Sequence, residues 1–235
     1  MNFHVGTSGH SYKEWKGSFY PEKLPAKQML AFYATKFDTV EVNGTFYRAP
    51  TEETVAGWAK EVPATFRFAV KAPQTITHIR RLANCDEEVA SLLAVVRTLK
   101  KRLGPLLFQL PPNFKKDVPR LKAFLALLKP RVPAAFEFRH ASWFDDEVVA
   151  LLRKNKAALC VADETDDLTV PFEATADWGY LRLRRTDYDD TALKMWADRM
   201  KAQAWEDCFV YFKHEDTGTG PKLGAKLLEL VGESK

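Results

Sequence analysis

Cysteines, long apolar runs and linker-like tracts are what this sequence has little of. Its three cysteines, Cys85, Cys160 and Cys208, are too few and too scattered for a disulfide framework. Cys160 and Cys208 stand in apolar runs, where we expect small hydrophobic residues rather than nucleophiles. No apolar run reaches the roughly 20 residues that span a bilayer, and no Gly/Ser-rich or low-complexity tract separates modules. These absences exclude a disulfide-stabilised scaffold, a membrane-spanning protein and a string of tethered modules.

The composition predicts one globular domain over residues 1–235. Hydrophobic residues make up 46% of the chain, which is enough for a sizeable core. The net charge is +4 and the pI is about 8.8, well below what a dedicated nucleic-acid-binding protein usually shows. The first expected strand begins at Phe3 and leaves no room for a signal peptide. We therefore expect a cytoplasmic protein.

Strand-like and helix-like segments alternate eight times. The strand-like segments have a polar and an apolar face, and they cover residues 3–7, 38–43, 66–71, 106–110, 134–143, 157–163, 180–184 and 208–213. This order predicts an α/β fold, a (β/α)₈ TIM-type barrel. An open doubly wound sheet fits less well, because its strands are usually apolar on both faces.

Helices are expected between these strands. Apolar residues at helical spacing predict helices over 27–37 and 86–103, the second stopped by Gly104 and Pro105. Four further helices are expected to begin after the N-caps Thr51, Asp117 and Ser142 and at Pro221, and one passes through Leu193, Trp196 and Met200. Residues 164–177 show no helical pattern, so we expect a long loop there and a barrel that is irregular around its sixth helix.

Charged side chains alternate with apolar ones inside the expected strands. In the stretch 134–143, Glu137 and Arg139 share one face, and Phe136 and Phe138 share the other. In a barrel the Phe face packs against helices, and the charged face points inward, toward the strand ends where active sites lie. The same reasoning places ten polar residues at the barrel mouth: Glu41, Asn43, Lys71, Gln109, Glu137, Arg139, Asp163, Arg182, Arg184 and Lys213.

The charges of this mouth group predict a small anionic ligand. Five cations face three carboxylates, and unmatched cations in a cleft of low dielectric constant attract anions. The alternative is a self-satisfied network of ion pairs, such as Glu137 with Arg182 or Glu41 with Lys71. Buried ion pairs are weak evidence for stability, because apolar replacements are often neutral or stabilising.

Several short motifs resemble those of one known family. They are Gly6-Thr7-Ser8-Gly9, Phe19-Tyr20-Pro21, Val40-Glu41-Val42-Asn43, Thr45-Phe46-Tyr47-Arg48, Thr77-His78, Phe108-Gln109-Leu110-Pro111-Pro112, Glu137-Phe138-Arg139-His140 and Ser142-Trp143. In combination they resemble the "domain of unknown function 72", or YecE-like, family. The resemblance implies a TIM-type barrel and no established activity. His10, Arg184-Arg185 and Lys213-His214-Glu215 depart from the pattern of that family, and the last two departures add cations at the mouth.

Glu41, Glu137 and Lys71 are the leading catalytic candidates. Glu41 and Glu137 come from the second and fifth strands and could face each other as acid and base, or as acid and nucleophile. Nearby cations would hold both ionised, so the general acid could be Lys71, His140 or Tyr47. Asp163 is the third candidate carboxylate. Lys71 could also form a Schiff base, since neighbouring cations lower the pKa of a lysine.

A phosphate cradle is expected after the eighth strand. Gly218 and Gly220 lie in a turn that leads into a helix N-terminus, a recurrent phosphate site in these barrels. The loop after the seventh strand would add Arg184 and Arg185. The alternative is an ordinary turn in which the glycines meet backbone constraints.

Residues of the mouth loops are expected to bind the rest of the ligand. Ser8, Tyr12, Tyr47, His140 and Trp143 are the candidates, and the aromatic ones could stack on a base or a sugar ring. The alternative is that these aromatic residues pack the loops over the barrel.

A metal site is the weakest of the candidate sites. Glu41, Glu137 and Asp163 could bind a metal with one of the histidines His78, His140 and His214. The sequence has no His-x-His or His-Glu-x-x-His spacing, and cations compete for the carboxylates. We therefore predict no metal and no cofactor.

Three hypotheses on function follow. The leading one is an enzyme of hydrolase or lyase type that acts on a small anionic, phosphorylated or carboxylated ligand. The second is a non-catalytic protein that binds a nucleotide or single-stranded nucleic acid through the basic, aromatic-lined mouth. The third is a metal-dependent isomerase or nuclease. The sequence decides neither the ligand nor the oligomeric state.

Overall fold

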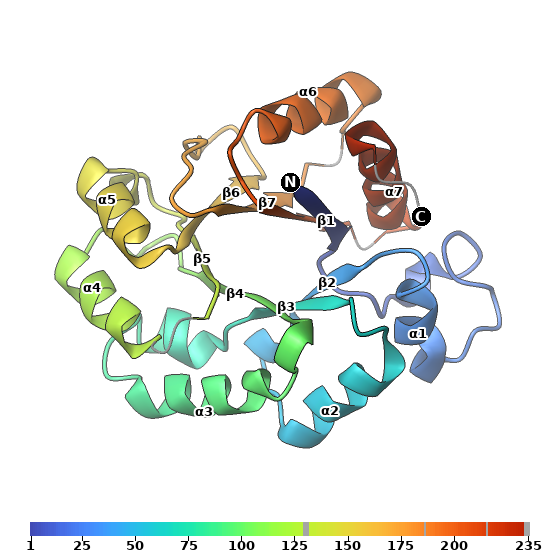
Figure 1. Cartoon of the computed structure of the whole chain (residues 1–235), viewed down its shortest axis with the longest axis horizontal. Helices are drawn as coiled ribbons and strands as arrows, with labels where there is room; N and C mark the ends of the chain where they lie inside the picture. Colours follow the sequence, from blue (N-terminus) through green and yellow to red (C-terminus); the bar gives the residue numbers. More distant parts are fainter. Residues whose placement is uncertain (129–131, 186, 215, 233–235) are drawn as a thin grey trace.

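The computed structural model describes residues 1–128, 132–185, 187–214 and 216–232. Eight parallel strands form a nearly closed barrel in the order β1-β8-β7-β6-β5-β4-β3-β2 (Figure 1). The strands are β1 (Asn2–Thr7), β2 (Thr39–Val42), β3 (Arg67–Lys71), β4 (Leu103–Gln109), β5 (Ala134–Glu137), β6 (Ala158–Asp163), β7 (Trp178–Leu183) and β8 (Asp207–Phe212). The predicted TIM-type barrel is confirmed.

Seven α-helices in the described part of the chain surround the barrel (Figure 1). They are α1 (Met29–Tyr33), α2 (Glu52–Glu61), α3 (Asp86–Arg97), α4 (Val118–Leu127), α5 (Asp146–Asn155), α6 (Asp190–Lys201) and α7 (Thr219–Val231). Residues 164–177, between β6 and β7, contain no helix, as predicted, and this is the irregularity of the barrel. None of the described helices has both the length and the apolar character needed to cross a membrane.

Two of the expected N-caps are confirmed, and one is wrong. Thr51 Oγ1 accepts a hydrogen bond from Thr54 N at 3.2 Å, and Asp117 Oδ1 accepts one from Arg120 N at 3.0 Å. Ser142 does not cap α5, because Asp145 lies closer to that helix and its Oδ1 accepts from Glu147 N at 3.0 Å. Ser142 Oγ instead accepts from Lys116 N at 2.8 Å and so joins two loops.

Several boundaries differ from the prediction, and those of α3, β4 and β5 differ most clearly. The helix expected over 86–103 ends at Arg97, so Gly104 and Pro105 do not stop it and instead lie inside β4. The β3–β4 register is irregular beside them, and a Cβ at Gly104 would lie 3.1 Å from the carbonyl oxygen of Phe68. This irregular pairing accommodates a proline, which cannot donate a ladder hydrogen bond. The strand expected over 134–143 ends at Glu137.

The seam between β1 and β2 is closed by a tyrosine rather than by a regular ladder. The hydroxyl of Tyr33, from α1, accepts a hydrogen bond from Thr7 N at 2.8 Å and donates one to Thr39 O at 3.1 Å. Gly9 N adds a direct bond to Glu41 O at 2.7 Å. Gly6 permits this approach, because a Cβ there would lie 2.2 Å from Thr39 O.

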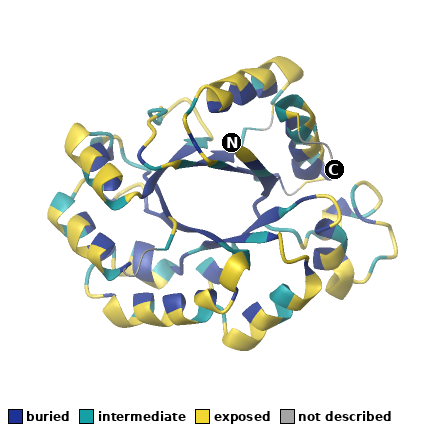
Figure 2. Cartoon of the chain, viewed as in Figure 1, coloured by how far each residue is buried: buried dark blue, intermediate teal, exposed yellow. Residues whose placement is uncertain are grey.

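The barrel interior is filled below the mouth. The small residues Ala69, Ala135 and Ala158 pack there in one cluster with the large rings of Tyr180 and Tyr211. The strands are buried, while the outer faces of the helices are exposed (Figure 2). The polar side chains at the strand ends therefore lie on a packed layer of side chains, and no open channel runs beneath them in the described part of the chain.

The expectation for Cys160 and Cys208 is confirmed, since both are buried among apolar residues. Burial raises the pKa of both thiols, so neither is a ready nucleophile at neutral pH.

Candidate functional site

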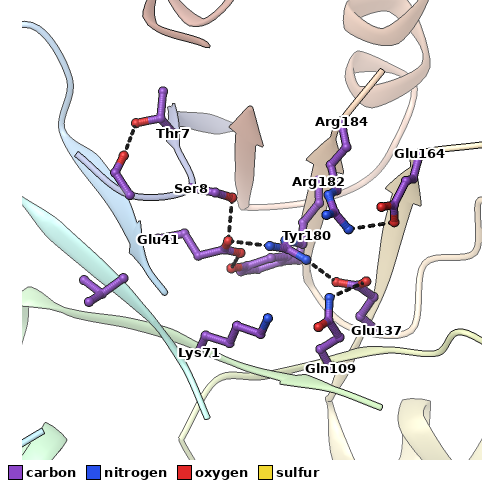
Figure 3. A network of polar contacts seen from close by, with 12 residues as sticks. Thr7, Ser8, Glu41, Lys71, Gln109, Glu137, Glu164, Tyr180, Arg182 and Arg184 are labelled. Carbon is purple, nitrogen blue, oxygen red and sulfur yellow. Dashed lines mark hydrogen bonds and ion pairs between the residues drawn. The ribbon is translucent and has the colours of Figure 1, made fainter. Parts of the chain in front are cut away.

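Arg182, on β7, lies between the two facing carboxylates of the barrel (Figure 3). Its Nη1 donates to Glu137 Oε2 at 2.6 Å, and its Nη2 donates to Glu41 Oε1 at 2.9 Å. All three residues are essentially buried. The predicted pairing of Glu137 with Arg182 is confirmed, whereas Glu41 also pairs with Arg182 and not with Lys71 as the alternative proposed.

Further donors satisfy both carboxylates. Ser8 Oγ and the Tyr180 hydroxyl donate to Glu41 at 2.5 and 2.6 Å. Gln109 Nε2 and Arg139 Nε donate to Glu137 Oε1 at 2.8 and 3.0 Å. A carboxylate with several donors is stabilised in its ionised form.

The electrostatics of the pair follow from these contacts. Burial alone would raise the pKa of Glu137, but the charges of Arg182 and Arg139 outweigh it and lower the pKa to about 2. For Glu41, burial likewise acts to raise the pKa, and the charge of Arg182 with its hydrogen bonds lowers it overall. Both groups are therefore ionised at neutral pH. Two ionised carboxylates fit the alternative of an ion-pair network better than they fit the role of a general acid.

Glu164 bridges two outer cations of the mouth, Arg139 and Arg184. Its Oε2 accepts from Arg139 Nη2 at 2.5 Å and from Arg184 Nη1 at 2.6 Å (Figure 3 shows the bond to Arg184). The side chain of Glu164 is 39% exposed, so solvent screens this carboxylate far more than Glu41 and Glu137. Arg184 and Arg139 are thus held in place by a carboxylate that solvent reaches.

A pocket of about 570 Å³ opens above the clamped carboxylates, within the size range of small-molecule sites. Its cationic lining consists of Lys71, Arg139, Arg182, Arg184 and Lys213. Its other lining residues are Tyr12, Asn43, Gly44, Phe46, Tyr47, Gln74, His78 and Gln109. Among the described residues that line it there is no carboxylate. The pocket is therefore a cationic surface with polar and aromatic walls.

Lys71 is the last residue of β3 and points toward Arg182 and its two carboxylate partners, Glu41 and Glu137, which together we call the clamp (Figure 3). Its Nζ lies 4.2 Å from the centroid of the Phe46 ring. Burial, followed by the charge of Arg182, lowers the pKa of Lys71 to about 8. A lysine in this state supplies a neutral amine near physiological pH.

Most of the sequence-predicted mouth residues meet in this pocket or directly beneath it. The pocket is lined by nine of them: Tyr12, Asn43, Tyr47, Lys71, Gln109, Arg139, Arg182, Arg184 and Lys213. Ser8, Glu41 and Glu137 lie below it in the clamp. Tyr12 also donates to Ser8 O at 2.7 Å, and Tyr47 is 78% exposed at the rim.

Asp163 is an exception among the predicted catalytic residues. Its carboxylate accepts from Arg185 Nε at 2.6 Å and from the Tyr188 hydroxyl at 2.7 Å. On β6, Cys160 packs in the barrel interior, so Asp163, three residues on, has the opposite parity and faces outward. The next residue, Glu164, reaches the mouth cations in its place.

His140 and Trp143 do not line the mouth pocket. His140 Nδ1 accepts from Ser142 N at 3.1 Å and caps a single 3₁₀ turn, Ala141–Trp143. Trp143 is buried, stacks on Phe138 and donates its indole N–H to Phe114 O at 2.6 Å. The packing interpretation of this tryptophan is the correct one.

The expected phosphate cradle is not assembled. Arg185 is engaged by Asp163 and Asp166. Gly218 has a left-handed φ of 79° and lies beside Ser18, in a separate pocket between α1 and α7. Gly220 is buried against the backbone of His214. Both glycines meet backbone constraints, as the alternative proposed.

The described residues contain no group of three His, Cys, Asp or Glu side chains that could hold a metal. Arg182 occupies the space between the two carboxylates that such a site would need.

The sequence gives no sign of the part that three residues play in the site. Strand alternation from Arg182 puts Tyr180 on the inward face but does not reveal its bond to Glu41. Phe46 stands out only as a loop aromatic residue, and its position beside the Lys71 amine depends on the fold. Nothing local marks Glu164, because its partners are 20 and 25 residues away.

Comparison with known proteins places these features in a family. The model of the family described as "Protein of unknown function DUF72" matches residues 4–235. The UPF0759 protein YunF of Bacillus subtilis (strain 168) is 28% identical over 260 residues, covering 91% of this chain and 90% of YunF. The UPF0759 protein YecE of Escherichia coli (strain K12) is 36% identical over 116 residues, which is 49% of this chain and only 43% of YecE.

A crystal structure of a DUF72 family protein from Thermotoga maritima has the same fold. It superimposes with a TM-score of 0.84 at 25% sequence identity, covering 99% of this chain and 100% of that one. The names of these relatives state no activity.

Proposed function

This chain belongs to the DUF72 family, whose name states no activity, and from its site we propose that the mouth pocket binds a small anionic ligand, phosphorylated or carboxylated. The match over residues 4–235 shows the family, and the structure shows the barrel. The ligand and the reaction are inferred from the mouth pocket. We propose that the protein is an enzyme of hydrolase or lyase type that acts on this ligand.

The observation that carries the proposal is the separation of charges in the mouth. The cations Arg139, Arg182 and Arg184 line the pocket, whereas their carboxylate partners lie beneath it or outside its lining. Cations on the wall of a half-buried cleft concentrate anions there. Arginine, moreover, matches the geometry of carboxylate and phosphate oxygens.

Two unsatisfied atoms support a polar ligand. Arg182 Nε and Asn43 Oδ1 are buried and have no hydrogen-bond partner among the described residues. Both residues line the pocket. A buried donor or acceptor without a partner costs about 1–3 kcal/mol. A ligand that displaced the side chains covering these atoms, and that offered an acceptor to Arg182 Nε and a donor to Asn43 Oδ1, would remove that cost.

Within this proposal Glu41 and Glu137 position Arg182 rather than transfer protons. Both carboxylates are ionised, buried and saturated with donors, so neither has a proton to give nor an easy route to accept one. Proton transfer falls to the groups that line the pocket itself, Lys71 and His78.

Isothermal titration calorimetry with inorganic phosphate and pyrophosphate tests the binding. We expect the wild type to bind both, and Arg184→Gln to bind at least about tenfold more weakly, because a charge-assisted hydrogen bond contributes about 1.5–3 kcal/mol. Arg153→Gln is the matched control, since Arg153 pairs with Glu173 at an exposed site away from the mouth. Equal affinities in Arg184→Gln and the wild type would refute the proposed site.

A nucleotide is the second candidate ligand, and the exposure of Tyr47 favours it. A tyrosine that is 78% exposed at the rim of a cationic pocket offers a face for a base. AMP should then bind more tightly than ribose 5-phosphate, and Tyr47→Ala should remove the difference. A longer single strand would add a steep loss of affinity with salt.

A further inference from the structure

The backbone that carries Lys71 is fixed by the loop above it. Thr45 Oγ1 donates to Lys71 O at 2.6 Å, and Lys71 pairs with Leu107 in the β3–β4 register. Ala69, two residues earlier, packs in the barrel interior. Alternation therefore points the Lys71 side chain inward, where it lines the pocket.

The surroundings of the Lys71 amine suit a nucleophile. The Phe46 ring, 4.2 Å from Nζ, covers one side of the amine; this contact by itself favours the ammonium form, but burial and the charge of Arg182 outweigh it. Arg182 repels the ammonium form, while Glu41 and Glu137, which favour it, are already paired with Arg182. With a pKa of about 8, about a tenth of the Lys71 side chains carry a neutral amine at pH 7, against well under a thousandth for an ordinary lysine.

A proton carrier lies on the same wall. His78 lines the pocket, and its ring packs edge-on against Phe46 with centroids 4.9 Å apart. One ring nitrogen pairs with Thr77 Oγ1 at 2.9 Å. Burial, followed by the charge of Lys71, lowers the pKa of His78, so the imidazole is neutral at pH 7 and able to accept a proton.

We propose that Lys71 forms an imine with the carbonyl carbon of an anionic oxo compound, a 2-oxo acid or a phosphorylated aldehyde or ketone, held in the mouth pocket. The inference rests on the proposed function, because Arg139 and Arg184 would bind the anionic group. It narrows the ligand from any small anion to one with a carbonyl. Imine formation is also a specific reaction for this pocket, and the names of the relatives state no reaction.

The step balances without an oxidant or reductant. The lone pair of the Lys71 amine attacks the carbonyl carbon and breaks the C–O π bond. One proton passes from nitrogen to oxygen, by way of His78, to give a carbinolamine. A second proton, taken from solvent, lets the hydroxyl leave as water, and the nitrogen lone pair forms the C=N bond. The product is a protonated imine, whose positive nitrogen draws electrons from the neighbouring carbon, as lyase-type chemistry requires.

Borohydride trapping on the full chain tests the proposal. Borohydride delivers hydride to the imine carbon and leaves a stable secondary amine. The probes are pyruvate, glyoxylate and glyceraldehyde 3-phosphate, with uncharged acetone for comparison. We expect one adduct per chain with at least one anionic probe, at least tenfold less with acetone, and peptide mapping to Lys71.

Two variants decide the outcome. Lys71→Arg keeps the positive charge without the nucleophile and should lose the adduct, while Lys116→Arg, at an exposed pair with Asp145, should keep it. No stoichiometric adduct with any anionic probe, or equal labelling in Lys71→Arg, would overturn the proposal. Phosphate calorimetry on the same samples separates the two claims. If phosphate binds and no adduct forms, only the imine is refuted, whereas absent phosphate binding refutes the anion site itself.

Discussion

Arg182 Nη1 donates to Glu137 Oε2 at 2.6 Å in the interior of the barrel, where neither side chain is more than 2% exposed. The other arm of the same guanidinium holds Glu41. The carboxylates that the sequence suggested as an acid and a base are thus joined by one cation. These two ion pairs hold Arg182 in the wall of the pocket.

Removal of Arg182 should be costly. Arg182→Met leaves two buried carboxylates without their cation, and we expect the free energy of unfolding at pH 7 to fall by about 3–5 kcal/mol in urea titrations. The triple variant Arg182→Met/Glu41→Gln/Glu137→Gln is the control, and it should recover most of the loss because no buried charge remains. A loss below about 1 kcal/mol in the single variant would show that the clamp does not need its cation.

The acid stability of the wild type should depend on Glu137. Its folded-state pKa, about 2, lies below the ordinary value of 4.5. Its stabilising contribution is therefore complete above pH 4.5 and is lost as the pH falls toward 2. Glu137→Gln should flatten the decline of the unfolding free energy in that window, and Glu173→Gln, at an exposed pair, should not.

Two histidines should give pH slopes of opposite sign. His4 pairs with Asp38 at 2.7 Å, and although burial opposes it, this contact raises its pKa above 6.5, so its stabilisation is present below pH 6.5 and is lost as the pH rises through the raised value. Burial lowers the pKa of His10 to about 4, so its stabilisation is present above pH 6.5 and is lost as the pH falls. Melting temperatures should be measured against pH. The His4→Gln variant should lack the decline as the pH rises above 6.5, and the His10→Gln variant should lack the decline as the pH falls below 6.5. Identical profiles in both variants would contradict this assignment.

Glu164 should compete with the ligand. It occupies Arg139 and Arg184, and its 39% exposure means that an anion can displace it. Glu164→Gln should bind inorganic phosphate about three- to tenfold more tightly, as expected when about 1 kcal/mol of competing exposed ion pairing is removed. Glu173→Gln, which releases only the remote Arg153, should bind as the wild type does. Weaker phosphate binding in Glu164→Gln would mean that this carboxylate orients the arginines and does not compete.

The seam of the barrel should not tolerate a methyl group at Gly6. A Cβ there would lie 2.2 Å from Thr39 O and 2.9 Å from the Tyr33 hydroxyl, so Gly6→Ala must push β1 from β2. We expect a loss of at least about 2 kcal/mol of unfolding free energy, because buried hydrogen bonds at the seam break. Gly57→Ala, inside α2 with nothing within 4 Å, should instead stabilise the protein by about 0.5–1 kcal/mol. Similar effects from both substitutions would contradict the close approach at the seam.

The outline of the fold was predictable because it depends on short-range patterns. The two-residue alternation that separates Glu137 from Phe136 is enough to assign the inward face of that strand, and it does the same for Arg182. The caps Thr51 and Asp117 were predictable for the same reason, since a helix N-terminus needs an acceptor nearby in the chain. Boundaries such as Gly104 were not, because the irregular register between β3 and β4 decides them.

The sequence by itself determined that charged side chains would enter a barrel whose core is apolar, and that cations would gather at its mouth. Only the tertiary structure decided which charge meets which. Arg182 pairs with both Glu41 and Glu137, Asp163 faces outward to Arg185, and Glu164 lies beside Arg139 and Arg184. The physical reason is distance along the chain. Alternation sets the direction of a side chain over two residues, whereas a Coulomb partner is set by closure of the barrel, which brings Glu41 to Arg182 across 141 residues.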